Sequence, residues 1–400
     1  MAPSIVRPAV HLDPRGYSAA RARHPWIFSG AVARVVGEPE PGAEVDVRGP
    51  DGSFVGRGLF NPHSQIRVRL YTAEEEPLDG AFFAARVRRA VALRSGLLGL
   101  ADPSGACRLV FSEGDELSGL TVDRYGRWLV VVLTGLGVAG RLEAILDVLE
   151  ELIEPEGILL RTEKGVGDEE GLVIRDGLLR GALPEEPVVI EEGESRFAVD
   201  LRVGQKTGFY LDQRRNRVRV ASYAAGRTIG DVCTYTGGFA VSAARAGASA
   251  VTAIDTSAPA LELAARNTDL NGVADRVELA RADAFTWLAE QAEAGRTYDL
   301  VVVDPPRFAR SRRGLEAALQ GYQRLNRLAL GCLSPGGILA TFSCSGRVAA
   351  ADFQTAVARG AVDAGRSLQI VERLAQSPDH PVSTKCPESA YLKGLVCAAD

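Results

Sequence analysis

The chain has 400 residues, of which 46% are hydrophobic and 24% are charged, and its formal net charge is −5. This composition excludes disordered and fibrous architectures and gives room for two or three folded domains. No apolar stretch is long enough to cross a membrane and no signal-peptide pattern opens the chain, so we expect a cytoplasmic protein without a membrane partner.

The cysteines and histidines give no sign of a metal centre. Six cysteines are scattered along the chain without a CxxC pair, and there are only four histidines. Zinc-ligand spacing is therefore absent, and we expect neither a metal nor a disulfide framework.

The first segment, residues 1–72, alternates short apolar runs with glycine and proline, which is typical of a small β-rich domain. The expected strands are 26–28, 43–47, 53–60 and 65–71. Apolar residues at helical spacing then predict a linking helix over 79–95.

Residues 73–190 are expected to form an α+β middle domain that includes this linking helix. Its pattern is interpreted as a strand-strand-helix-strand-strand unit with an acidic amphipathic helix at 141–152. The expected strands lie at 107–111, 119–123, 128–133, 157–161 and 172–175.

From residue 191 to residue 400 short β-branched runs alternate with long helices rich in alanine, leucine and arginine. This alternation predicts parallel βαβ units and an α/β, Rossmann-like, doubly wound sheet. The expected strands are 227–232, 250–255, 277–279, 299–304 and 337–343.

An acidic residue stands at the end of each of the first four strands of this domain: Asp231, Asp255, Asp283 and Asp304. Ligands of such sheets bind at the carboxyl ends of the strands. Asp255 follows Asp231 by 24 residues, where an acid typically binds ribose hydroxyls, and Asp283 is suited to an adenine amino group. The alternative is that these acids are helix N-caps.

Asp231 is followed by a turn with two glycines, after which a helix is expected to begin. The spacing of these glycines does not fit the G-x-G-x-x-G motif, so a dinucleotide ligand is disfavoured. A ligand with a ribose, an adenine and no phosphate suits the crevice, and S-adenosylmethionine, with S-adenosylhomocysteine as its product, is such a ligand. The residues expected to line its site are Asp231, Tyr235, Thr236, Gly237, Phe239, Asp255, Asp283 and Asp304.

Two further strand ends carry residues suited to chemistry on a pyrimidine. Asp304-Pro305-Pro306 is a rigid exit that can present an acid to the planar polar edge of a base. Cys344, in Ser343-Cys344-Ser345 after the fifth strand, is suited to add to carbon-6 of a pyrimidine, which activates carbon-5. The alternative is a passive cysteine near a cofactor.

Basic side chains gather in two segments despite the negative net charge. Residues 205–220 hold five basic side chains and one acidic, and residues 307–327 hold six and one. Such segments can bind RNA phosphates, although a solvated helix face is an equally good interpretation. The candidate RNA-binding residues are Lys206, Arg214, Arg215, Arg307, Arg310, Arg312 and Arg313.

Several longer motifs resemble those of one family. They are HPWIFSG at 24–30, GQKTGFYLDQR at 204–214, DVCTYTGGF at 231–239, DPPRF at 304–308, SCS at 343–345, DHP at 379–381 and YLKG at 391–394. Together they resemble the bacterial 23S ribosomal RNA cytosine-C5 methyltransferases with an N-terminal PUA domain, over essentially the whole chain. GQKTGFYLDQR also resembles the corresponding segment of ribosomal guanine methyltransferases. The prediction that the target base is cytosine therefore depends on Ser-Cys-Ser.

The resemblance implies a PUA-like RNA-binding domain over 1–72 and a class I methyltransferase domain over 191–400. It implies Cys344 as the nucleophile, Asp304 at the N3/N4 edge of the base, and 23S ribosomal RNA or a large-subunit precursor as substrate. The oligomeric state stays open, a homodimer included.

One position departs from the two-cysteine RNA cytosine methyltransferases, which carry a second cysteine where this chain has Arg307. Another group must then accept the carbon-5 proton, and the candidates are Glu388, Asp379, Lys393 or a water held by Asp304. Alternatives for the whole protein are a guanine-nitrogen methyltransferase, a non-catalytic RNA-binding assembly factor, and a small-molecule methyltransferase that would leave the basic segments unexplained.

Overall fold

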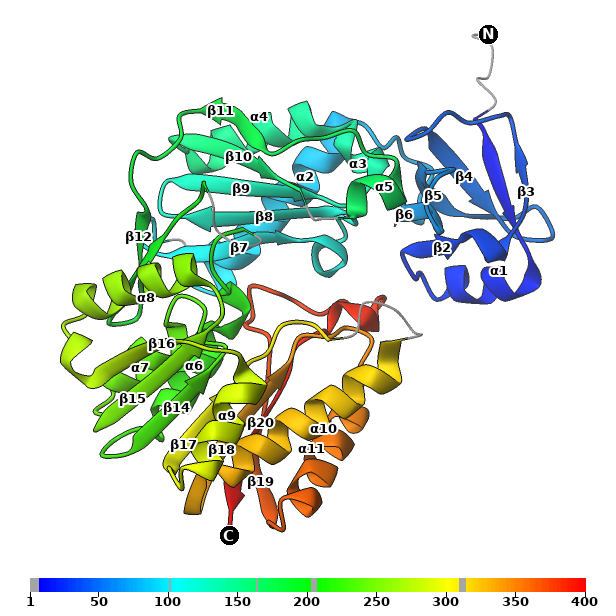
Figure 1. The fold of residues 1–400 in the computed structure, drawn as a ribbon. Coiled ribbons are helices and arrows are strands. Elements are labelled where there is room, and N and C mark those ends of the chain that lie inside the picture. Colours follow the sequence, from blue (N-terminus) through cyan, green and yellow to red (C-terminus); the bar gives the residue numbers. More distant parts are fainter. Residues whose placement is uncertain (1–6, 101, 163–164, 203–206, 309–313) are drawn as a thin grey trace, which may run out of the picture. The chain divides into compact units, whose positions relative to one another are not determined.

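The computed structural model describes residues 7–100, 102–162, 165–202, 207–308 and 314–400 (Figure 1). Its chain divides into two compact units. The first unit comprises residues 1–188, 200–209 and 379–389, and the second comprises 189–199, 210–378 and 390–400. The domain borders expected after residues 72 and 190 stay predictions.

The first unit opens with a six-stranded sheet in the order β2-β6-β5-β4-β1-β3, in which β1 and β4 run parallel. Alternate residues such as Val45 and Val47 are buried, so one face of the sheet forms a core with α1 (Pro14–Arg21). The expectation of a β-rich segment is confirmed, although β1, β3 and α1 were not foreseen. The strands are β1 (Ala9–Leu12), β2 (Trp26–Phe28), β3 (Val32–Val36), β4 (Glu44–Arg48), β5 (Phe54–Phe60) and β6 (Ile66–Thr72).

A second sheet of the first unit has the order β11-β10-β9-β8-β7. Phe83, Val87 and Ala90 form the buried stripe of α2 that packs in its core. The strands are β7 (Ala106–Phe111), β8 (Leu120–Tyr125), β9 (Trp128–Leu133), β10 (Gly157–Arg161) and β11 (Gly177–Gly181). The helices are α2 (Gly80–Ala92), α3 (Leu136–Ala139), α4 (Leu142–Ile153) and α5 (Val166–Glu170).

Two details of the expected middle unit are wrong. The three strands expected before the acidic helix α4 are present, so the strand-strand-helix-strand-strand pattern counts one strand too few, and the last strand is Gly177–Gly181 instead of 172–175. Leu172 is used in the turn after α5, where its N–H donates to the carbonyl of Gly167. The carboxylate of Asp176 accepts from the backbone and the hydroxyl of Thr162, so the ladder with β10 begins only beyond it.

The second unit contains a seven-stranded sheet in the order β16-β15-β14-β17-β18-β20-β19 (Figure 1). The five strands from β16 to β18 run parallel, and β20 runs antiparallel between β18 and β19. The doubly wound, mostly parallel sheet is thus confirmed. The strands are β14 (Thr228–Val232), β15 (Ala250–Asp255), β16 (Val277–Arg281), β17 (Tyr298–Val303), β18 (Leu333–Ser343), β19 (Leu368–Ala375) and β20 (Lys393–Ala399).

Helices cover both faces of this sheet. Val301 and Val303 of β17 pack in one buried cluster with α9, α10 and α11, whereas Leu300 and Val302 pack in another with α6 and α7. A hairpin of β12 (Val188–Glu192) and β13 (Ser195–Val199) precedes α6 in the chain. The helices are α6 (Arg214–Ala221), α7 (Gly238–Arg245), α8 (Ala258–Leu270), α9 (Ala284–Glu293), α10 (Leu315–Gly331) and α11 (Ala350–Asp363).

The order of the strands in this sheet indicates where a ligand is expected to bind. Winding proceeds from β14 outward through β15 and β16, and then outward on the other side through β17 and β18. Ligands bind where the winding changes direction, outside the carboxyl ends of β14 and β17.

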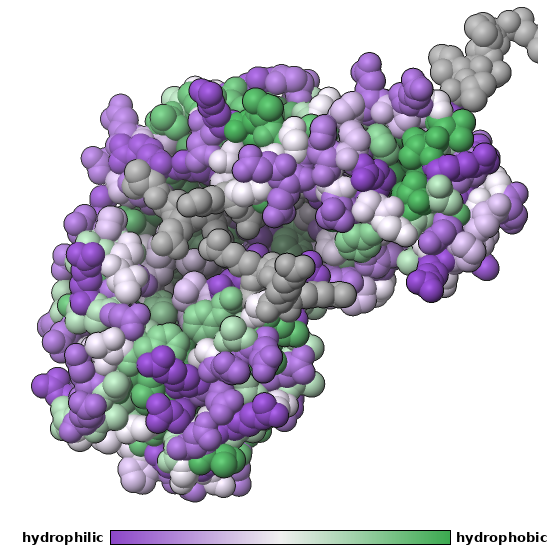
Figure 2. Space-filling view, turned by 45° about the vertical axis from the view of Figure 1, so that its right-hand side comes forward, coloured by the Kyte–Doolittle hydropathy of each residue, from purple (hydrophilic) through white to green (hydrophobic). Residues whose placement is uncertain are grey.

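The exposed surface is mixed in polarity. Figure 2 shows hydrophilic side chains over most of the visible face, with small hydrophobic patches between them. Among the described residues, every helix is too short or too polar to cross a membrane.

Candidate active site

The four strand-end carboxylates gather around one residue of the second unit, Cys233. Burial raises the pKa of the Cys233 thiol, and Asp255, Asp304, Asp231 and Asp283 each raise it further through their negative charge. The fold therefore brings the four acids to a common place. Such a concentration of negative charge favours a positively charged ligand.

The loop after β14 has an unusual backbone. Cys233, Tyr235 and Gly237 have φ values of 64°, 53° and 80°, so every second residue is left-handed. A side chain at Gly237 would also bring a Cβ atom within 3.3 Å of the Cβ of Ala264. Non-glycine residues hold this conformation only where the surroundings enforce it, and such strain gathers at ligand sites.

Hydrogen bonds to Asp231 help to hold this loop in its conformation. Its Oδ2 accepts from the Thr234 hydroxyl at 2.5 Å and from the Ala240 N–H at 3.0 Å. Burial raises the pKa of Asp231 to about 6, and the charge of Asp255 adds to the rise. Asp231 Oδ1 and the Thr236 hydroxyl are buried without a hydrogen-bond partner among the described residues. Unsatisfied buried polar atoms are rare, so these groups make the loop a candidate binding segment.

Asp255 and Asp283 differ in their local bonds. Asp255 accepts from the N–H of Tyr235 at 2.9 Å and from that of Ser257 at 2.9 Å, which ties the loop to the end of β15. Asp283 caps α9, since its Oδ1 accepts from the N–H groups of Phe285 and Thr286. The N-cap interpretation therefore holds for Asp283. A carboxylate has about four acceptor positions, so both residues keep capacity for a ligand.

Phe239 lies on α7 and is almost fully buried. Its ring centroid is 5.4 Å from that of Phe342 on β18. It therefore belongs to the core beneath the loop in this structure, and a contact with the cofactor stays a prediction.

Cys344 is held between two buried serines. The hydroxyl of Tyr322, on α10, lies 2.9 Å from the Ser343 oxygen and 3.0 Å from the Ser345 oxygen. Both serines are fully buried, whereas Cys344 is partly exposed. Its Sγ lies 3.9 Å from the carbonyl oxygen of Pro305. The two serines thus fix the backbone on either side of the thiol, next to the Asp-Pro-Pro exit of β17.

Asp304 is held by a residue that sequence reasoning did not single out. Gln213 is buried, and its Nε2 donates to Asp304 Oδ2 at 3.0 Å. Gln213 Oε1 accepts from Asn216 Nδ2, which also donates to the carbonyl of Ala375. This chain of bonds fixes which end of the amide faces Asp304. The sequence could have pointed to Gln213, because this residue lies in the GQKTGFYLDQR motif at 204–214.

Lys393 begins β20, directly opposite Ser343 in the ladder with β18. Its Nζ donates to the carbonyl oxygen of Ser345 at 2.7 Å. Burial lowers the pKa of the Lys393 amine to about 8, the Cys344 thiol acts to raise it, and the Arg307 guanidinium acts to lower it. Among the three side chains proposed as proton acceptors, Lys393 therefore has an electrostatic interaction with Cys344.

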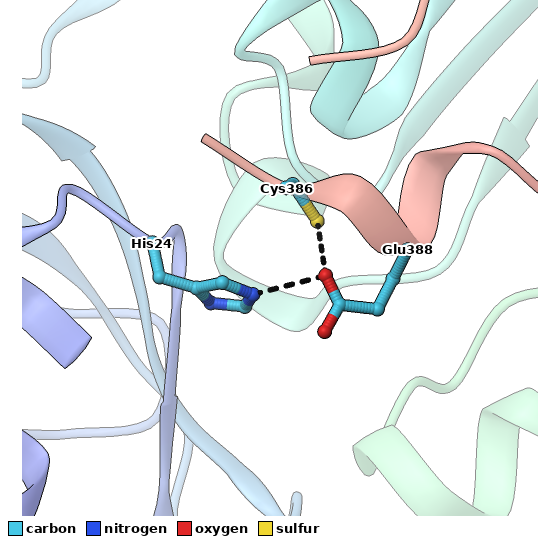
Figure 3. A group of neighbouring side chains, drawn as sticks. All are labelled: His24, Cys386 and Glu388. Carbon is cyan, nitrogen blue, oxygen red and sulfur yellow. Dashed lines mark hydrogen bonds and ion pairs between the residues drawn. The ribbon is translucent and has the colours of Figure 1, made fainter. Parts of the chain in front are cut away.

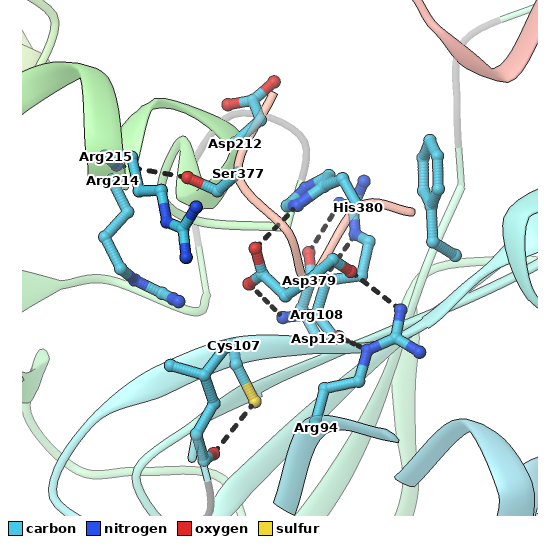
Figure 4. A network of polar contacts seen from close by, with 12 residues as sticks. Arg94, Cys107, Arg108, Asp123, Asp212, Arg214, Arg215, Ser377, Asp379 and His380 are labelled. Carbon is cyan, nitrogen blue, oxygen red and sulfur yellow. Dashed lines mark hydrogen bonds and ion pairs between the residues drawn. The ribbon is translucent and has the colours of Figure 1, made fainter. Parts of the chain in front are cut away.

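The other two acids belong to the first unit and are engaged there. Asp379 is fully buried, and its carboxylate accepts from the Arg108 N–H and pairs with His380, while its carbonyl accepts from Arg94 (Figure 4). Glu388 Oε2 lies 3.2 Å from His24 Nε2 and 3.6 Å from Cys386 Sγ (Figure 3). Their contacts are those of structural anchors.

The cluster of His24, Cys386 and Glu388 has ligand-type atoms within 4.8 Å of one another. The backbone N–H of Trp26, however, donates to His24 Nδ1 at 3.1 Å. The neutral ring then carries its proton on Nε2, which donates to Glu388. A metal would need the Nε2 lone pair, so this geometry is that of a hydrogen bond.

The basic residues fall into different environments. Arg215 and Arg307 are exposed, whereas Arg214 is partly buried with its Nε 3.7 Å from Glu192. Arg217, counted in the first basic segment, is buried and pairs bidentately with Glu192. Lys206, Arg310, Arg312 and Arg313 lie outside the described residues.

Comparison with known proteins agrees with this architecture. A model of S-adenosylmethionine-dependent methyltransferases matches residues 178–397, and a model of PUA-like domains matches residues 10–73. The chain is 42% identical, over 389 residues, to ribosomal RNA large subunit methyltransferase I of Shewanella amazonensis, covering 97% of this chain and 98% of the relative. It is 43% identical to the same enzyme of Aeromonas hydrophila, covering 94% and 96%.

Among solved structures, an S-adenosylmethionine-dependent methyltransferase of Streptococcus mutans has a TM-score of 0.85 at 20% identity, covering 98% of this chain and 99% of that one. A methyltransferase solved with S-adenosylhomocysteine gives 0.86 at 20% identity, with the same coverage. These two show the shared fold. From the match over more than half its length and its 42% identity to the curated relatives, the chain belongs to the S-adenosylmethionine-dependent methyltransferases, in the ribosomal RNA large subunit methyltransferase I family.

Proposed function

We propose that the protein methylates carbon-5 of a cytosine in 23S ribosomal RNA through a covalent adduct with Cys344. The observation that carries this proposal is the position of Cys344. It is partly exposed, fixed between two buried serines, and 3.9 Å from the Pro305 carbonyl that follows Asp304. A nitrogen methyltransferase has no use for a thiol placed in this way.

The residues around the β14 loop fit the methyl donor. S-adenosylmethionine, when bound, supplies an electrophilic methyl group on a positively charged sulfonium. The four carboxylates that act on Cys233 provide the complementary negative charge. Asp255 is suited to the ribose hydroxyls and Asp283 to the adenine amino group. The left-handed loop from Cys233 to Gly237 brings backbone close to the ligand.

The side chains of the second unit then divide the chemistry. Cys344 adds to carbon-6 of the cytosine, which makes carbon-5 a nucleophile toward the methyl group. Asp304, held by Gln213, binds the N3/N4 edge of the ring. A base then takes the carbon-5 proton, for which a water held by Asp304 is a candidate, and the electron pair left behind restores the double bond as the bond between sulfur and carbon-6 breaks and frees Cys344.

The RNA substrate is proposed from three features together. The curated relatives are named as ribosomal RNA large subunit methyltransferases, and a PUA-like match covers residues 10–73. Arg215 and Arg307 are exposed cations of the second unit. Phosphate contacts of such residues hold RNA without specifying its sequence.

The test is methyl transfer from tritiated S-adenosylmethionine to unmodified 23S ribosomal RNA, for the wild-type protein and Cys344→Ala. We expect label only with the wild type, and we expect it in 5-methylcytidine after digestion to nucleosides. A matched control is Cys332→Ala, which removes a buried thiol directly before β18, at the opposite end of the strand from Cys344, and should keep activity. Equal label from Cys344→Ala, appearing on guanine, would overturn the proposal. So would a folded protein that binds RNA and transfers no methyl group.

A further inference from the structure

Cys344 can add to a ring carbon only as a thiolate, because the neutral thiol is a weak nucleophile. The structure must therefore offer a group that takes the thiol proton and balances the resulting charge. The negative charge of a neighbouring carboxylate destabilises a thiolate, and Asp304 lies in the same site. A cation beside the thiol would balance the charge of the thiolate.

Lys393 stands where such a cation is needed. It opens β20 opposite Ser343, one residue before Cys344 on the neighbouring strand β18. Its Nζ is fixed at 2.7 Å from the carbonyl of Ser345, one residue after Cys344. The amine therefore bridges the turn on which the thiol sits, and its titration is coupled to that of Cys344.

Among the described residues, the other titratable groups known to act on Cys344 or Lys393 do not supply this function. Tyr210 and Tyr322 both interact with the thiol, but burial raises the pKa of each phenol, so both stay neutral. Asp304 is an acid bound by Gln213, so it supplies no positive charge. Arg307 lies close enough to act on the Lys393 amine, and it adds positive charge but cannot accept a proton.

We propose that Lys393 activates Cys344: its neutral amine takes the thiol proton, and the ammonium so formed stabilises the thiolate until it adds to the cytosine. The S–H bond breaks and an N–H bond forms, with no net gain or loss of protons. When the product is released, the thiolate–ammonium pair is restored. This role rests on the proposed function, since it concerns the thiol of the same site.

The environment of the amine suits this exchange. A lysine in water keeps its proton at neutral pH, but burial brings the pKa of Lys393 to about 8. Amine and ammonium are then both accessible near physiological pH, which is the condition for efficient proton transfer. Burial readily lowers the pKa of a lysine side chain, whereas an arginine side chain stays charged.

The test follows alkylation of Cys344 by iodoacetamide against pH, with peptide mass spectrometry to separate the six cysteines. Full-length wild type, Lys393→Met and Lys393→Arg are compared without RNA. An opposite charge nearby shifts a titration by roughly 1–3 pH units, so we expect Lys393→Met to alkylate about tenfold or more slowly at pH 7. Lys393→Arg cannot take the thiol proton, which then passes to water, but it keeps the charge that stabilises the thiolate, so its alkylation rate is expected to stay within about threefold of wild type.

Two controls separate this effect from misfolding. Cys332 and Cys397 are fully buried, so they should remain unmodified in every folded variant. Lys385→Met removes a lysine that pairs with Glu116 in the first unit and should leave the Cys344 profile unchanged.

A Lys393→Met profile that superimposes on the wild type would overturn the proposal. If that variant instead accumulates a methylated covalent adduct with RNA, Lys393 acts on the carbon-5 proton and not on the thiol. The alkylation readout is independent of methyl transfer. Failure of the Lys393 role therefore leaves 5-methylcytidine formation in place, whereas failure of the proposed function appears in the Cys344→Ala assay.

Discussion

The side-chain amide of Gln213 donates a 3.0 Å hydrogen bond to Oδ2 of Asp304, and both residues belong to the second unit. Gln213 precedes α6 whereas Asp304 follows β17, so the bond joins the segment before α6 to the strand end that we propose binds the base. Asn216 holds the other end of the amide. Gln213 is therefore a positioning residue for Asp304.

Gln213→Leu should leave Asp304 free to turn away from the N3/N4 edge of the base. Small displacements of a group that orients substrate lower rates by up to about 100-fold, so we expect kcat to fall by about 10- to 100-fold with little change in S-adenosylmethionine affinity. The matched control is Gln323→Leu on α10, whose amide bonds only to Asp363 at the surface among the described residues. Equal activity of the two variants would remove Gln213 from the site.

Tyr322→Phe tests how the Ser-Cys-Ser turn is fixed. The change removes one hydroxyl and leaves two fully buried serine oxygens without that partner. A lost partner of a buried polar group costs about 1–3 kcal/mol, so the midpoint of urea unfolding should fall accordingly. Tyr17→Phe, whose hydroxyl contact to Ser53 is exposed and 3.4 Å long, should change stability little. An unchanged midpoint in Tyr322→Phe would show that water replaces the hydroxyl.

The sheet of the second unit was largely predictable, because parallel buried strands leave continuous β-branched runs in the sequence. All five of its parallel strands were expected within a few residues. The antiparallel strands β19 and β20 were not, although Lys393 begins β20. β19 is largely exposed, and its sequence LQIVERLA has no regular alternation of apolar and polar residues, so its periodicity does not indicate a strand.

The site was predictable at the level of residue types and less so at the level of bonds. The series of strand-end acids follows from the topology, which brings carboxyl ends to one edge. The N-cap role of Asp283 is a local contact that the sequence already offered as an alternative. The burial of Asp231 and the pairing of Arg217 with Glu192, by contrast, depend on contacts between segments that are distant in the chain. Charge counted along the sequence cannot separate a buried ion pair from an exposed cation.

Asp231 should make stability depend on pH in an unusual direction. Its pKa is about 6 in the folded protein, against about 3.9 for an unfolded aspartate. Between these values the folded state binds more protons, so this residue's contribution falls as pH rises from about 4 to 6, by about 3 kcal/mol in total, and is constant above.

Asp231→Asn isolates that contribution. Both donors that Asp231 holds bond to one oxygen, Oδ2, which the asparagine carbonyl can replace. The stability of the wild type minus that of Asp231→Asn, measured without cofactor, should therefore decline between pH 4 and 6. Asp299→Asn is a control of opposite sign, since hydrogen bonds from Thr228 lower the pKa of Asp299. A flat difference for Asp231 would show that its carboxyl is hydrated in solution.

The basic segment over 205–220 should divide into a structural and an RNA-binding part. Arg217 is buried against Glu192, and its Nη1 also donates to the carbonyl of Tyr210. Arg217→Met leaves the buried Glu192 carboxylate without this partner, which costs about 3–5 kcal/mol of stability. Loss of stability without a change in the salt dependence of RNA binding is the expected pattern, measured by urea unfolding and filter binding.

Arg215, two residues earlier, should behave in the opposite way. Its side chain is exposed, and its backbone N–H donates to Ser377 regardless of the side chain. Arg215→Ala should change stability by less than about 0.5 kcal/mol. If Arg215 contacts a phosphate, the slope of log affinity against log salt becomes shallower by about one. Arg359→Ala, an exposed arginine of α11 outside both basic segments, is the matched control. Identical salt slopes for the two variants would show that the Arg215 side chain does not contact an RNA phosphate.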